Sequence, residues 1–178
     1  MFLRIFLICI SILPLQKKEP SINWSASNTL SWTDFKAAVE TDSKAVAITA
    51  SGITFGYSIK KRNDEVVGFH TKIEAHFYPN KSWVKIEQAD KHILAHEQFH
   101  FNITELFARK FRQRVAQLQV YPNVSVALDT MHQEINQELA DYQELYDAET
   151  DYSRNKKLQL HWQNHIEVEL AKLDKYKL

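Results

Sequence analysis

The sequence predicts an α+β protein, in which a small antiparallel sheet is followed by three helices. Apolar and polar residues alternate over residues 53–77, as they do in half-buried strands, and apolar residues recur at helical spacing from about residue 89 onward. Strands that come first and helices that come after them favour this class. At 178 residues the chain is long enough for one domain with a substantial core, and we assign residues 20–178 to it.

The alternating stretch predicts a β-hairpin. One strand is expected over residues 53–59, a turn at residues 62–64, and a second strand over residues 67–77. Because side chains alternate between the two faces of a strand, one face of the hairpin is apolar and the other is left to water. Residues 82–86 are expected to form a third short strand.

Three helical segments follow the hairpin. The first is expected at about residues 89–118, the second at about 125–146, and the third from about residue 156 onward. Pro122 separates the first two, since proline cannot continue a helix. The polar residues 147–155 are expected to form a connection between the second and third helices.

The first predicted helix carries the most informative motif of the chain, the sequence HEQFH at residues 96–100. Positions i and i+4 lie about 40° apart around a helix, so the two imidazoles point the same way and can share one zinc ion. Glu97 then lies beside the metal, where it can accept a proton from a zinc-bound water. The motif therefore predicts His96 and His100 as zinc ligands and Glu97 as the general base.

The surroundings of this motif favour a buried site. Both histidines share a helical stripe with Ile93, Ile103 and Phe107, so they lie on the face that is expected to pack against the core. The alternative is a pair of core histidines without metal, which would need several hydrogen-bond partners.

A second histidine pair has the same spacing. His161 and His165 lie on the third predicted helix and flank the apolar stripe of Trp162, and no Glu follows His161. We expect this pair to be solvated.

Composition excludes several classes of function. Acidic and basic residues balance at 22 each without a polybasic run, so nucleic acid is not an expected partner. Only 3 glycines occur, and neither a Gly-rich phosphate loop nor a G-x-S-x-G motif is found, which argues against nucleotide-dependent chemistry and a serine hydrolase. Cys9 is the single cysteine, so disulfides and thiolate ligands are not expected in a mature chain that lacks the first residues.

Residues 1–16 are predicted as a signal peptide. Arg4 precedes an apolar run over residues 5–15, which is too short to span a bilayer comfortably. The protein is therefore expected to be secreted or periplasmic. An uncleaved N-terminal anchor stays open as the alternative, and only in that case do we expect contact with a membrane.

Several stretches together resemble one family: "NWSASNTLSWTDF", "PNKSWV", "ILAHEQFHFNITELFARKFR", "YDAET" and "NKKLQLHW". It is the family of secreted bacterial proteins catalogued as domain of unknown function nine-hundred-and-twenty-two, described as predicted zinc-dependent proteases. The resemblance covers nearly the whole chain after the signal segment. It implies a zincin-like arrangement, with an active-site helix under a small sheet and two further helices that close the site.

The family also suggests a third ligand. Its later motif runs Tyr-Asp-x-x-Thr-x-His, and here Tyr146, Asp147 and Thr150 match while Tyr152 stands at the place of the His. The resemblance therefore points to Tyr152 as the third zinc ligand, with Glu149 as the neighbouring alternative.

These observations predict a zinc-dependent protease that hydrolyses peptide bonds in a peptide or protein substrate outside the cytoplasm. By analogy with other zincins, the sheet edge around residues 69–77 is expected to hold the substrate as an added strand. A non-catalytic zinc-binding module and a metal-free interaction module of the export compartment are the alternatives. The substrate's side chains and the oligomeric state are left open.

Overall fold

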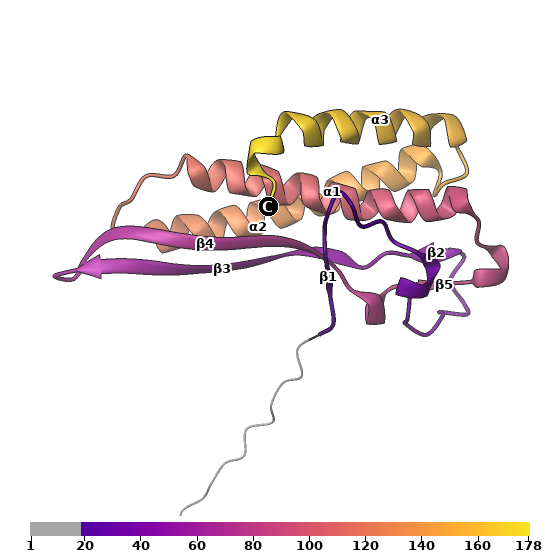
Figure 1. The fold of residues 1–178 in the computed structure, drawn as a ribbon, viewed down its shortest axis with the longest axis horizontal. Helices are drawn as coiled ribbons and strands as arrows, with labels where there is room; N and C mark the ends of the chain where they lie inside the picture. The colour runs from indigo at the N-terminus through magenta and orange to yellow at the C-terminus, as the bar shows by residue number, and fades with distance from the viewer. Residues whose placement is uncertain (1–18) are drawn as a thin grey trace, which may run out of the picture.

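The fold is described by a computed structural model, in which residues 19–178 are placed (Figure 1). The predicted signal peptide or anchor at residues 1–16, with Cys9, lies outside the described residues. The described chain is α+β, with a small antiparallel sheet followed by three helices, as the sequence predicts. None of the described helices combines the length and apolar character that crossing a membrane requires.

The predicted hairpin is confirmed. Strands β3 (Ser51–Arg62) and β4 (Glu65–Phe77) pair antiparallel along their whole length, and the turn residues Asn63 and Asp64 have positive φ angles of 50° and 64°. Asn and Asp tolerate this left-handed conformation better than most residues. Strand β1 (Ile22–Asn23) pairs with the end of β4, which gives the order β1-β4-β3.

The predicted third strand is present but shorter than expected, and it does not join this sheet. Strand β5 (Trp83–Val84) pairs antiparallel with β2 (Ala47–Ile48), so the two form a separate two-stranded sheet. Strand β2 was not predicted, because two residues are too few to show alternation. Short 3-10 turns occur at Trp32–Asp34, Pro79–Lys81, Ile86–Gln88 and Asp174–Tyr176.

Helix α1 (Lys91–Ala116) is the central element of the molecule. It begins at Asp90, whose side chain accepts a hydrogen bond from the backbone N–H of Ile93, as an N-cap residue does. It packs against the hairpin and against both other helices, so buried side chains occur around most of its circumference. Figure 1 shows the three helices on one side of the hairpin, with α3 farthest from the strands.

Helices α2 (Val124–Thr150) and α3 (Lys156–Lys172) complete the core. Helix α2 continues through residues 147–150, which the sequence analysis assigned to a connection. It ends at Asp151, which has a left-handed conformation (φ 50°) and donates its N–H to the last carbonyl groups of the helix. Asp147 is therefore a helical residue, one turn after Gln143.

Candidate metal centre

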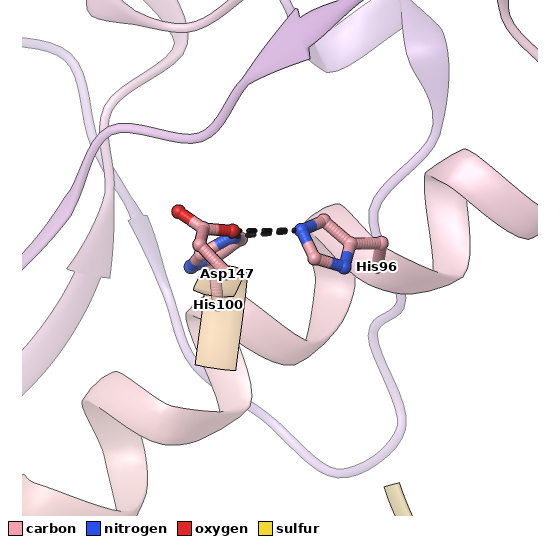
Figure 2. Close-up of side chains that lie close together, drawn as sticks. All are labelled: His96, His100 and Asp147. Atoms are coloured by element: carbon pink, nitrogen blue, oxygen red, sulfur yellow. Dashed lines mark hydrogen bonds and ion pairs between the residues drawn. The ribbon is translucent and has the colours of Figure 1, made fainter. Parts of the chain in front are cut away.

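Three side chains converge between α1 and α2. The Nε2 atoms of His96 and His100 each lie 3.0 Å from Oδ1 of Asp147, and 3.2 Å from one another (Figure 2). Ligand atoms about 2.0–2.1 Å from a tetrahedral zinc ion are separated by roughly 3.3 Å. The three atoms thus form a triangle of suitable size, and this His–His–Asp cluster could hold a metal ion.

Secondary structure supplies the alignment. His96 and His100 are one turn apart on α1, and both are buried, with exposures of 3% and 8%. Asp147 reaches them from the last turn of α2 because that helix continues beyond residue 146. The buried ring of Tyr146, one residue earlier, stacks on His96 at 4.6 Å and meets His100 edge-on at 5.1 Å, so it contacts both imidazoles.

A chain of hydrogen bonds orients His100. Thr104 donates its hydroxyl to the carbonyl of His100 and accepts the side-chain amide of Gln143 at 3.3 Å. The amide oxygen of Gln143 therefore faces His100, whose Nδ1 lies 2.5 Å away and donates to it. Such a bond on the far nitrogen fixes the tautomer that presents Nε2 to a metal. The Nδ1 atom of His96 is buried and has no partner among the described residues.

Interactions within the cluster shift the pKa values of Asp147 and His100. Burial opposes ionisation of Asp147, but the hydrogen bonds and charges of His100 and His96 outweigh it and hold the pKa of Asp147 well below its usual range. Burial likewise opposes protonation of His100, but the hydrogen bond to Asp147 and the charges of Glu97 and Asp147 raise its pKa. A proton and a metal ion would therefore compete for the Nε2 atom of His100.

Glu97 lines the same cavity as the cluster. The cavity has a volume of about 250 Å³, and Glu97 is 5% exposed within it. Glu97 follows His96 on α1 and is not one of the three clustered donors. Its role as a base stays a prediction.

The two ligands that the family resemblance suggests, Tyr152 and Glu149, have different surroundings. Tyr152 lines the cavity but is 63% exposed, and its ring lies 5.8 Å from the guanidinium of Arg154. Glu149 accepts a hydrogen bond of 2.7 Å from Trp162 Nε1, which directs its carboxylate towards α3. Glu149 is not part of the cluster of His96, His100 and Asp147, and ligation by Tyr152 stays a prediction.

Asp147 was not predicted as a candidate ligand from the sequence. The available signals were its match to the family motif and its spacing of four residues from Gln143, which would place both side chains on one face if the helix continued. The expected substrate edge at residues 69–77 also differs from the structure. The strand that lines the cavity is β2 with its neighbours, residues 45–49, and no residue of 69–77 does so within the described chain.

The fold and the cluster together define an α+β protein with a candidate metal centre between two helices. The chain belongs to the family described as "Bacterial protein of unknown function (DUF922)", whose model matches residues 34–154, and the resemblance inferred from the sequence is thereby confirmed. The match includes all three clustered side chains. No curated protein and no solved structure matches the chain.

Proposed function

We propose that this protein is a zincin-like, zinc-dependent hydrolase of peptide bonds that acts outside the cytoplasm. In this proposal His96, His100 and Asp147 hold the metal, and Glu97 is the general base. The observation that carries it is the triangle of donor atoms at 3.0–3.2 Å in a cavity that Glu97 also lines. The location rests on the apolar N-terminal segment of the sequence.

The donor set fits zinc better than the other common ions. Two imidazoles and one carboxylate are ligands that zinc accepts, whereas magnesium and calcium prefer oxygen ligands alone. Within the described chain, the cluster contains no fourth His, Cys, Asp or Glu. Three protein ligands are typical of catalytic zinc sites and four of structural ones, which supports an enzyme over a closed structural site.

When bound, zinc polarises a carbonyl group and lowers the pKa of a coordinated water to about 7. The residues of the chain supply the remaining steps. Glu97 accepts the proton of the attacking water and delivers it to the leaving nitrogen, since a buried carboxylate beside the site can do both in turn. Gln143 holds His100 in the orientation that keeps its Nε2 atom directed at the cluster.

The direct test uses metal analysis and one isosteric variant. We expect one zinc ion per chain in freshly purified protein, and hydrolysis of peptides that depends on it. Glu97→Gln should retain zinc but lose about 10²–10⁴-fold in activity, because an amide cannot accept the proton. The matched control is Glu144→Gln on the surface of α2, which should not change the rate. Undiminished cleavage by Glu97→Gln would assign the base elsewhere.

A metal-free packing cluster is the competing function class, and one observation favours it. The Nε2–Oδ1 distances of 3.0 Å are also those of ordinary hydrogen bonds between the two histidines and Asp147. Elemental analysis separates the two, since absence of stoichiometric metal after purification without chelators would support packing and reject the hydrolase.

A further inference from the structure

One wall of the metal-site cavity is a strand with an unpaired edge. Residues 45–49 line the cavity together with His96 and Glu97, and two of them, Ala47 and Ile48, form β2. Strand β2 pairs with β5 on one side, and no described strand pairs with its other side. Thr49 donates its hydroxyl to the carbonyl of Glu97 at 3.3 Å, so the end of this strand is tied to α1 beside the proposed base.

The register shows which main-chain groups face away from β5. Ala47 lies opposite Val84, and the N–H of Lys85 donates to the carbonyl of Val46 at 2.7 Å. Bonded and non-bonded pairs alternate in an antiparallel ladder, so the N–H and C=O groups of Ala47 and Thr49 point to the edge opposite β5. No turn, loop or side-chain hydrogen bond engages these groups within the described chain.

These free groups are well placed for another extended chain. Ala47 is only 6% exposed, and buried main-chain donors and acceptors are paired in the great majority of cases. Residues two apart on a strand are separated by roughly 6.6–6.8 Å, which is also the repeat of an extended peptide.

We propose that Ala47 and Thr49 bind the main chain of an extended polypeptide segment as a strand added to β2, beside Glu97. The choice of a polypeptide as ligand rests on the proposed peptide hydrolysis, but binding at this edge does not require it. Recognition through the main chain accepts many side chains. It requires a segment without secondary structure of its own, so the ligand class is unfolded or mobile polypeptide rather than a folded surface.

Hydrogen exchange tests this proposal residue by residue. The ¹⁵N-labelled Glu97→Gln protein, with zinc and after its removal, is mixed with a pool of short unstructured peptides of mixed sequence. Exchange of the Ala47 and Thr49 amides should slow by about tenfold or more. The Ile48 amide is the internal control, because it already faces Trp83 in the ladder and should not change. A pool with methylated backbone nitrogens should bind about tenfold less tightly, since it cannot pair.

Two variants test the same edge from the protein side. Ala47→Pro removes an N–H that faces the cavity, whereas Val84→Pro removes one on the far edge of the same sheet. Peptide binding should weaken in the first variant and persist in the second, with circular dichroism to verify folding of both. If either variant unfolds, the comparison of methylated with unmethylated peptides tests the added strand instead.

The outcomes separate this proposal from the proposed function. Protection of Ala47 and Thr49 by peptides that the wild-type protein never cleaves would support the added strand and reject the hydrolase. The added strand would be overturned if the peptides fail to bind. It would also be overturned if they bind or are cleaved without protecting these amides. The Ala47 and Thr49 amides could also become protected in the absence of peptide, to a degree that increases with protein concentration. That result would show that a second copy of the chain pairs with this edge, and it would overturn the proposed binding of a peptide strand.

Discussion

Two pairs of histidines in this chain share one spacing and have opposite surroundings. His96 and His100 lie on α1, where they are buried and their Nε2 atoms approach within 3.2 Å. His161 and His165 lie on α3 and are exposed. In both pairs the helix aligns the two imidazoles, so the i,i+4 spacing alone does not create a site.

The difference lies in what faces each pair. Helix α2 packs against α1 and brings Asp147 to the first pair, whereas the second pair flanks Trp162, whose indole packs towards the core. His165 meets that indole edge-on at 6.2 Å. A third donor from another element, together with burial, therefore distinguishes a candidate metal centre from a solvated pair.

The largest expected effect removes one ligand of the buried pair. His96→Ala and His100→Ala should each weaken zinc binding by about 100-fold or more, because a structural zinc site is stabilised by about 10–16 kcal/mol over its ligands and each tenfold is about 1.4 kcal/mol. Competition with a chelating dye measures this. His161→Ala and His165→Ala are the matched controls and should bind zinc as the wild type does. Equal losses of zinc affinity in both pairs would show that the i,i+4 spacing, and not Asp147, determines where zinc binds.

The next comparison asks which residue is the third ligand. Asp147→Asn should weaken zinc binding by a similar factor, because it replaces the carboxylate oxygen that both imidazoles contact with a poorer ligand. Tyr152→Phe should leave zinc binding nearly unchanged, because Tyr152 is largely exposed to solvent although it lines the cavity. The reverse result would make Tyr152 the ligand, as the family motif suggests.

The sequence was sufficient for the elements with a long periodic pattern. The hairpin and α1 could be predicted because alternation over residues 53–77 and helical spacing around the HEQFH motif extend over many residues. Burial of His96 and His100 followed from the same spacing. Exposure of His161 and His165 was likewise expected, since they flank the apolar stripe of α3.

The rest depended on contacts between distant segments. Asp147 is polar and precedes a left-handed turn, so local propensity favoured a connection, and packing of α2 on α1 is what keeps residues 147–150 helical. Strand β2 has two residues and owes its conformation to pairing with β5. Such a pair is set by long-range contact, which no local pattern reports.

A smaller effect is expected from the residue that orients His100. Gln143→Leu removes the acceptor of its Nδ1 proton and should weaken zinc binding by about 10–100-fold, the usual range for partners that orient a ligand. Gln137→Leu, at an exposed position of the same helix, is the control and should have no effect. A loss confined to thermal stability, with zinc affinity unchanged, would mean that Gln143 only supports packing.

The smallest effect concerns Tyr146, which links the two histidine pairs through ring packing. Its ring contacts His96 and His100 on one side and lies 5.5 Å from Trp162, the indole that His165 also contacts. The hydroxyl is buried without a partner among the described residues.

Tyr146→Phe keeps every ring contact and removes that hydroxyl. We expect it to leave zinc binding unchanged and to stabilise the protein by about 1 kcal/mol, because an unpaired buried hydroxyl carries a desolvation cost. Tyr146→Leu removes the aromatic ring and should destabilise by about 2 kcal/mol while weakening zinc binding, since both imidazoles lose a neighbour that fixes their planes. Urea unfolding with and without zinc measures both effects. If Tyr146→Phe were the more damaging change for zinc or for hydrolysis, the hydroxyl itself would contribute to the site, and ring packing would not explain the conformation of the buried pair.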